Sequence, residues 1–177
     1  MGNYLFRVFN SLLGSELVPA FVRGKLMRAA GFKVSNTCTI WAGCSIRSKK
    51  IAIGTNVFIN VGFFFDGDDY CSVGNNVRIG QFVRIITATH NIGPSSQRGM
   101  VEVISKPVRI EDGSWIGAGV TIMPGVTIGP GCIIATNSVV TESTKADGLY
   151  AGTPAKRVRD LSPSGSRVRE GEALSST

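Results

Sequence analysis

The sequence predicts an all-β solenoid: a parallel β-helix of about five coils, with a helical segment before it and one protruding loop. The clearest sign is a six-residue repeat between Val108 and Val140. Large apolar residues recur there every six positions, each two positions after a smaller one, as Val108/Ile110, Ser114/Ile116, Val120/Ile122, Val126/Ile128, Cys132/Ile134 and Ser138/Val140. A helix needs apolar residues three and four positions apart, whereas this pattern alternates briefly and then breaks. Glycines fall at the breaks, where a sharp corner has little room for a β-carbon.

The same pairing continues upstream of the clear repeat. Nine more pairs follow it, namely Phe32/Val34, Cys38/Ile40, Cys44/Ile46, Ile51/Ile53, Val57/Ile59, Phe63/Phe65, Cys71/Val73, Val77/Ile79 and Val83/Ile85. Fifteen strands at three per turn give five coils, a length at which neighbouring coils can bury a continuous apolar interior. The sequence therefore predicts a solenoid over residues 32–141.

The register of this repeat slips three times. One extra residue lies between Ile46 and Ile53, two lie between Phe65 and Val73, and nineteen lie between Ile85 and Ile110. The first two are small corner insertions. The third predicts an inserted loop at residues 86–107, and a loop of that length in a compact domain is usually functional.

Residues 1–31 are predicted to form a helical cap of two helices divided near Pro19. The expected apolar faces are Leu5, Val8, Phe9, Leu12 and Leu13 on the first helix, and Phe21, Val22, Leu26 and Met27 on the second. Charged residues interrupt the segment before it reaches the length of a membrane span, and it lacks the pattern of a signal peptide. Two interpretations remain open: a lid over the exposed first coil, or a basic amphipathic face in peripheral contact with anionic lipid through residues 1–30.

The net charge of +7 is unevenly distributed. Residues 34–144 hold eight basic and seven acidic side chains and are nearly neutral, so the positive excess lies at the two ends. Basic proteins often bind nucleic acid, but the sequence has no interleaved aromatic and basic stripe and no recognisable nucleic-acid module. We therefore expect no nucleic-acid partner.

The four cysteines, Cys38, Cys44, Cys71 and Cys132, all occupy the first position of an inward pair. Free cysteine behaves as a small buried hydrophobe, so core packing explains all four. A zinc site needs converging Cys or His residues, and the chain has no Cys-x-x-Cys pair and a single His. We expect reduced thiols, no metal and a cytoplasmic compartment.

Three sequence segments resemble a known group of enzymes. The runs SWIGAGVTIMPGVTIGPGCIIATNSVVT and AGTPAKRVRDL, with THN inside the long loop, are similar to the hexapeptide-repeat acyltransferases of the galactoside, maltose and serine acetyltransferase type. The resemblance covers residues 34–161. It implies a left-handed β-helix, acetyl-CoA as acyl donor, a homotrimer with active sites between subunits, and a C-terminal cap and cofactor-binding segment at residues 142–161.

His90, the only histidine, lies in the inserted loop. A single His in a polar loop is more often a surface residue, yet imidazole is the usual general base at neutral pH. The resemblance implies that His90 takes the proton from the acceptor hydroxyl as that oxygen attacks the thioester. This makes His90 the predicted catalytic residue.

Asn60 and the three acids of the DGDD run, Asp66, Asp68 and Asp69, are the predicted acceptor-binding residues. Asn60 stands at a corner where other coils have glycine, and Asn tolerates the left-handed region, so a plain corner role is the alternative. The resemblance places it where galactoside acetyltransferases hold an acceptor-bonding asparagine. Three roles are open for these acids: a solvated corner, binding of sugar hydroxyls, or orientation of the imidazole. Their spacing in the sequence does not decide among these roles.

The resemblance also supplies a set of cofactor-binding residues: Trp115, Gly117, Ala118, Gly119, Thr141, Lys156, Arg157 and Arg159. Position 118 in the family offers its backbone amide to the thioester region, and such an amide can also stabilise an oxyanion. The basic residues after Pro154 are expected to face the adenosine phosphates, since Arg and Lys bind phosphate well.

The predicted function is direct acetyl transfer from acetyl-CoA to a hydroxyl of a small-molecule or lipid-linked sugar, as in a polysaccharide precursor. The compartment is cytoplasmic or the inner face of a membrane. Alternatives are N-acetylation of an amino sugar, O-acetylation of an antibiotic, and a non-enzymatic solenoid scaffold or assembly module. Residues 162–177 have the polar composition of a disordered tail.

Overall fold

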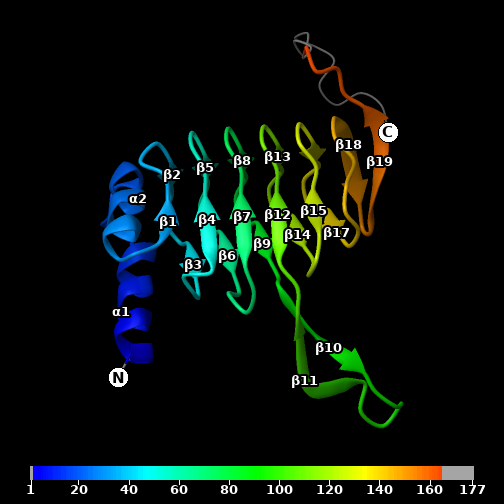
Figure 1. Ribbon diagram of the computed structural model, residues 1–177, viewed down its shortest axis with the longest axis horizontal. Helices are drawn as coiled ribbons and strands as arrows, with labels where there is room; N and C mark the ends of the chain where they lie inside the picture. Colours follow the sequence, from blue (N-terminus) through cyan, green and yellow to red (C-terminus); the bar gives the residue numbers. More distant parts are fainter. Residues whose placement is uncertain (1, 165–177) are drawn as a thin grey trace.

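The computed structural model describes residues 2–164, so most of the predicted tail at 162–177 lies outside the described residues. Figure 1 shows a prism of stacked coils with two helices at one end and a two-stranded arm projecting from its side. The helices are α1 (Gly2–Gly14) and α2 (Ala20–Ala29). The arm is formed by β10 (Ala88–Ile92) and β11 (Gly99–Ser105).

The remaining strands form three walls, each a sheet of parallel strands. The first wall contains β1 (Lys33–Val34), β4 (Ile51–Ile53), β7 (Cys71–Val73), β12 (Val108–Ile110) and β15 (Thr127–Ile128). The second contains β2 (Thr39–Ile40), β5 (Phe58–Ile59), β8 (Arg78–Ile79), β13 (Trp115–Ile116), β16 (Ile133–Ile134) and β18 (Gly148–Gly152), with antiparallel β19 (Ala155–Asp160) beside β18. The third contains β3 (Ser45–Ile46), β6 (Phe64–Phe65), β9 (Arg84–Ile85), β14 (Thr121–Ile122) and β17 (Val139–Val140).

Each coil turns at three corners. The first corner leads from the first wall to the second, the second corner from the second wall to the third, and the third corner from the third wall to the first. In Figure 1 the first wall faces the viewer, and its strands run upward as the chain advances from the helices on the left toward the C-terminus on the right, which is a left-handed course. The predicted left-handed parallel β-helix is therefore confirmed.

The interior of the prism is filled by the predicted pairs. Both members of every pair are buried, and the apolar ones form a single continuous cluster. Equivalent residues stack in register from coil to coil, as Ile59, Ile79 and Ile116 do on the second wall. The four cysteines are buried in the same core and are free thiols, as their position in the repeat predicts.

The solenoid is longer than predicted. Five complete coils are present, and β18 adds a further rung to the second wall, giving about six turns. Strand β18 was missed because the chain between Val140 and Tyr150 leaves the six-residue spacing. Tyr150 closes this end of the core: it is 8% exposed, and its hydroxyl accepts a hydrogen bond from the Lys145 backbone N–H at 2.8 Å.

The two predicted helices are present, but their buried faces differ from the prediction. Leu13 and Met27 are buried, whereas Val8, Leu12, Phe21 and Leu26 are 40% to 67% exposed. On α2 the face toward the prism is instead formed by Arg23, Gly24 and Met27. Glycine is needed at position 24 because a β-carbon there would lie 2.7 Å from the Cys38 sulfur. Neither helix is long and apolar enough to cross a membrane.

The guanidinium of Arg23 joins the helices to the first coil. The side chain is 1% exposed and donates to the backbone carbonyls of Leu13, Ser15, Val18 and Ile40. These acceptors belong to the end of α1, the turn after it and strand β2. A buried charge is tolerated only when it is fully hydrogen-bonded, as it is here. An amphipathicity argument misses this residue because it treats arginine as a surface side chain.

We predict that Arg23→Ala destabilises the protein by on the order of 3 kcal/mol, because several buried carbonyls lose a charged donor. Arg28→Ala, which removes an exposed arginine from the same helix, should change stability by no more than about 0.5 kcal/mol. Urea unfolding at a matched protein concentration measures both. Equal midpoints for the two variants would refute the anchoring role of Arg23.

Candidate active site

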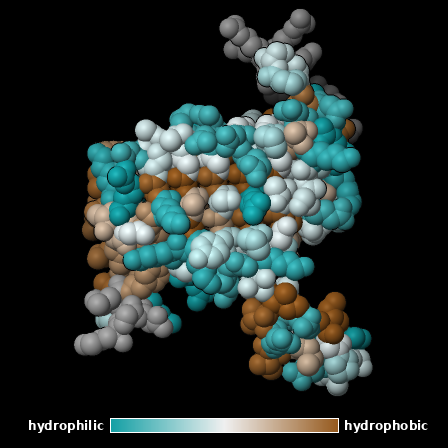
Figure 2. All heavy atoms as spheres, in the orientation of Figure 1, coloured by the Kyte–Doolittle hydropathy of each residue, from teal (hydrophilic) through white to brown (hydrophobic). Residues whose placement is uncertain are grey.

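The arm rises from the third corner, between β9 and β12 (Figure 1). The predicted protrusion at 86–107 is present, but it is an antiparallel ribbon rather than an irregular loop. His90 pairs with Val103 across the ribbon, and the register shifts between His90 and Ile92. The arm is also apolar on its surface, since Ile92, Val101 and Val103 are 86%, 84% and 54% exposed. Figure 2 shows brown, apolar spheres gathered on the arm at the lower right.

The imidazole of His90 is exposed near the middle of β10. It makes no hydrogen bond to another residue of the described part of the chain. None of the three aspartates at the third corner therefore orients it within one chain. The ring is available to a ligand or to a neighbouring molecule.

Asp66 holds the base of the arm. Its carboxylate accepts hydrogen bonds from the Thr87 N–H at 2.6 Å, from the Thr87 hydroxyl and from the Ala88 N–H at 3.2 Å. The Thr87 hydroxyl oxygen in turn accepts from the Asp69 N–H at 3.0 Å, and Thr87 is fully buried. These contacts fix the direction in which β10 leaves the prism, and they give Asp66 a positioning role.

The other two acids of the run differ from each other. The Asp69 carboxylate accepts from the Tyr70 N–H at 2.7 Å. The Asp68 carboxylate is exposed and makes no hydrogen bond within residues 2–164, although its backbone carbonyl accepts from Lys50 Nζ at 2.7 Å. That Asp66, Asp68 and Asp69 bind the acceptor stays a prediction, and the geometry favours Asp68.

A groove of about 340 Å³ runs along the second corner. It brings together four of the predicted residues, namely Asn60, Trp115, Gly117 and Ala118, with Gly119 directly following. Asn60 also serves its own corner, because its side-chain oxygen accepts from the Val61 N–H at 2.9 Å. Trp115 is 57% exposed on the adjoining wall.

The first and second corners differ in how many backbone amides are capped by side chains. At the first corner two amides are capped: the Thr55 N–H donates to Asn75 Oδ1 at 2.9 Å, and the Asn75 N–H donates to Asp112 Oδ1 at 2.7 Å, whereas the Asp112 N–H has no acceptor among the described residues. This backbone hydrogen bond from Asn75, with a side-chain one, lowers the pKa of Asp112.

At the second corner, the amides of Gln81, Ala118 and Thr136 have no acceptor among the described residues. These three residues occupy successive coils, so their N–H groups form a ladder of unused donors. The coils approach closely here, since a β-carbon on Gly80 would lie 2.6 Å from the Ala118 nitrogen. Glycine is thus required for the close approach of the coils at this corner.

The C-terminal basic residues are not equivalent. The Arg157 guanidinium donates to the carbonyls of Lys145, Ala146 and Asp147 and to the Tyr150 hydroxyl at 2.9 to 3.1 Å. The hydrogen bond to Tyr150, followed by that to Asp160, raises the pKa of Arg157. Arg157 therefore holds the β18–β19 hairpin against the last coil, which sequence reasoning did not foresee.

Lys156, Arg159 and Thr141 are exposed. Lys156 lies 3.5 Å from the Glu142 carboxylate, and both side chains are largely solvent-accessible, so this ion pair is weak. These three residues, rather than Arg157, remain free to contact a cofactor.

The two parts of the predicted site lie at different corners of one prism. His90 stands on the arm at the third corner, whereas Ala118 and its groove lie at the second, and the third wall separates those corners. A single chain therefore presents His90 and the second-corner groove on different sides.

A triangular parallel β-helix built on a six-residue repeat is the hexapeptide-repeat class of fold. Residues 107–142 match the family model described as bacterial transferase hexapeptide (six repeats). A hexapeptide-repeat acetyltransferase of Vibrio cholerae, solved with acetyl-CoA, is 30% identical with a TM-score of 0.74, and the match covers 90% of this chain and 87% of that one. The chain belongs to the hexapeptide-repeat acetyltransferase family, of the galactoside and maltose O-acetyltransferase type.

Two further relatives carry that type. A maltose O-acetyltransferase from Clostridium difficile is 27% identical with a TM-score of 0.80, and the match covers 90% of this chain and 86% of that one. The galactoside O-acetyltransferase of Lactococcus lactis is 34% identical over 116 residues, which are 66% of this chain and 56% of that protein. The chain spans a little more than half the length of the curated relatives it matches.

We predict that Asp66→Ala loosens the arm without unfolding the prism. The loss of three hydrogen bonds at Thr87 and Ala88 should speed amide exchange across residues 88–105 by about tenfold or more, because a charged acceptor contributes on the order of 1.5 kcal/mol or more. Hydrogen exchange read by mass spectrometry measures this. Asp68→Ala is the matched control and should leave exchange in the arm unchanged; if both variants exchange like the wild type, Asp66 does not position the arm.

Proposed function

We propose that this protein transfers an acetyl group from acetyl-CoA to a hydroxyl group of a sugar. The observation that carries the proposal is the ladder of unpaired backbone amides in the second-corner groove. It is supported by the Vibrio cholerae relative, which was solved with acetyl-CoA. The names of the maltose and galactoside relatives support a sugar as the acceptor.

The groove suits the pantetheine arm of coenzyme A. That arm is long and narrow and carries two amides, so its carbonyl oxygens need donors spaced along a line. The N–H groups of Gln81, Ala118 and Thr136 provide such donors on successive coils, about 4.8 Å apart. In this arrangement the Ala118 amide faces the thioester and stabilises negative charge as it develops on the carbonyl oxygen.

His90 acts as the general base in the proposed reaction. Its imidazole nitrogen takes the proton from the acceptor hydroxyl while the hydroxyl oxygen attacks the thioester carbonyl carbon. The tetrahedral intermediate then collapses, the carbon–sulfur bond breaks, and the imidazolium returns its proton to the departing thiolate. The products are an O-acetylated sugar and free coenzyme A, and no acyl-enzyme forms.

This chemistry requires a second copy of the chain. Because the arm and the groove of one prism face different sides, His90 of one copy must serve the groove of another. A closed ring of three, as the family resemblance implies, satisfies this requirement at each interface. The exposed apolar residues Ile92, Val101 and Val103 give the arm a surface that a neighbour can bury.

We predict that His90→Ala lowers kcat by a factor on the order of 100 or more while coenzyme A binding stays intact, because the hydroxyl loses its base. Thiol release from acetyl-CoA with galactosides and maltose as acceptors measures turnover. Thr89→Ala, on the same strand, is the control and should keep most of the activity. Near-normal turnover in His90→Ala would remove the assigned role.

We predict that Ala118→Tyr blocks coenzyme A, because the ring occupies the groove beside the free amides. Isothermal titration should show a loss of affinity of at least about tenfold, corresponding to about 1.4 kcal/mol. Ala29→Tyr makes the same change on α2 and should bind normally. Unchanged affinity in a folded Ala118→Tyr protein would contradict the cofactor assignment.

Co-expression of these two variants tests whether the site is shared. In mixed rings, about a quarter of the interfaces combine an intact His90 with an intact Ala118 from the neighbour. The mixture should therefore recover up to about a quarter of wild-type activity, although each variant alone is inactive. A mixture as inactive as its components would show that base and groove act within one chain.

A further inference from the structure

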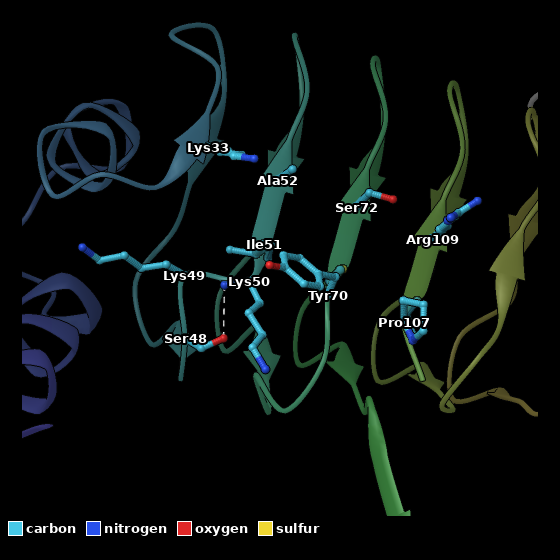
Figure 3. Close-up of a pocket in the computed structure, with 12 residues that line it drawn as sticks. Lys33, Ser48, Lys49, Lys50, Ile51, Ala52, Tyr70, Ser72, Pro107 and Arg109 are labelled. Carbon is cyan, nitrogen blue, oxygen red and sulfur yellow. Dashed lines mark hydrogen bonds between the residues drawn. The ribbon is translucent and has the colours of Figure 1, made fainter. Parts of the chain in front are cut away.

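A hollow larger than the second-corner groove lies on the first wall, and it is rich in cations. This first-wall groove has a volume of about 620 Å³, and Lys33, Lys50, Tyr70, Ser72 and Arg109 are among the residues that line it. Figure 3 shows these side chains rising from β1, β7, β12 and the third corner. No Asp or Glu lines the groove, whereas four Lys and Arg side chains do.

The strand register places two of these cations at opposite ends of one row. Lys33 pairs with Ala52 on the neighbouring strand, Ala52 pairs with Ser72, and Ser72 pairs with Arg109. Neighbouring strands lie about 4.8 Å apart, so three such steps place the backbones of Lys33 and Arg109 about 14 Å apart. The side chains between them are short, so the row forms a trough with a positive charge at each end (Figure 3).

These two end cations have no protein partner within the described part of the chain. The ion pairs found there involve Lys156 and Arg157, at the far end of the prism. Within the groove, Lys50 Nζ donates a hydrogen bond to the Asp68 carbonyl at 2.7 Å, and Lys49 Nζ lies 5.9 Å from the centre of the Phe32 ring. Lys33 and Arg109 are exposed and make no side-chain hydrogen bond to any described residue.

The position of the groove connects it to the proposed reaction. Pro107 and Val108, which line it, directly follow the arm that carries His90. Lys50 binds the backbone of Asp68, the acid with a free carboxylate. The exposed ring of Tyr70, which is 64% accessible, lies toward Ile51 at the same edge and offers an apolar face with a polar tip (Figure 3).

We propose that the first-wall groove binds an anionic group of the acceptor, so that the preferred acceptor is a sugar bearing a phosphoryl or carboxylate group. This inference rests on the proposed acetyl transfer and names its substrate class. One of the two end cations, Lys33 or Arg109, forms charge-assisted hydrogen bonds to the anion, and Tyr70 packs against the sugar. A neutral sugar leaves both charges unpaired and binds more weakly.

The test uses the full chain without acetyl-CoA, so that binding is measured apart from catalysis. Glucose, glucose 1-phosphate and glucuronate are titrated calorimetrically at low salt. At least one of the two anionic sugars should bind at least about tenfold more tightly than glucose, and the tighter of the two identifies the charged group. The preference should shrink as ionic strength rises, since the groove is open to solvent.

Substitutions in the first-wall groove test which residues bind the anionic sugar. At least one of Lys33→Gln and Arg109→Gln should weaken binding of the anionic sugar by about tenfold, while glucose binding stays unchanged. Lys25→Gln, which removes an exposed charge from α2, is the control. Equal affinity for glucose and the anionic sugars, or unchanged affinity in both groove variants, overturns the inference. Acetyl transfer is assayed separately, and if every sugar fails to release thiol from acetyl-CoA, the proposed function fails while the titrations still judge the groove.

Discussion

The stacking of inward side chains from coil to coil is the interaction on which the rest of the structure depends. A six-residue unit contributes two inward residues and cannot enclose them alone. Ile59, Ile79 and Ile116 become buried only because each lies directly over its equivalent in the next coil. Stability in such a repeat comes from neighbouring units, so the register of every strand is fixed by those on either side. The ends are then the vulnerable places, and Arg23 at one end and Tyr150 with Arg157 at the other supply polar contacts that cover them.

The three corners of the prism carry the features that the regular core does not determine. Asn75 and Asp112 cap the backbone of the first corner, the second corner keeps its amides open, and the third accepts insertions of different length. One regular scaffold thereby presents a closed edge, a donor-rich edge and an arm. Because the donor-rich edge and the arm face different sides, the proposed reaction calls for more than one chain.

Most of the solenoid could be predicted from the sequence because its repeat is strict. Each inward pair is a local pattern, and every one of them is buried. Strand β18 departs from the period and was missed for that reason. The predicted faces of α1 and α2 were only partly right. Leu13 and Met27 are buried, but on α2 an arginine with four carbonyl acceptors and a glycine in close contact with Cys38 take the place of other expected apolar residues.

The candidate site was less predictable because several of its properties belong to the backbone. A free backbone amide has no signature in the sequence. The amides of the second corner are unpaired because neighbouring coils supply no hydrogen-bond acceptor for them. Likewise, Asp66 and Arg157 were predicted to contact ligands, yet the Asp66 carboxylate accepts from Thr87 and the Arg157 guanidinium donates to the carbonyls of Lys145, Ala146 and Asp147. The pairing of the arm into a ribbon also gives His90 a defined place that a loop would not.

The construction of the arm has a consequence for how such an enzyme behaves at high dilution. A lone two-stranded ribbon is marginally stable in water, and the one that carries His90 is attached to the prism only at its base. In the proposed ring of three, dissociation leaves the ribbon without a neighbour while the stacked core stays folded. The proposed acetyl transfer per chain should then fall as the protein is diluted, even while spectroscopy still reports an intact fold.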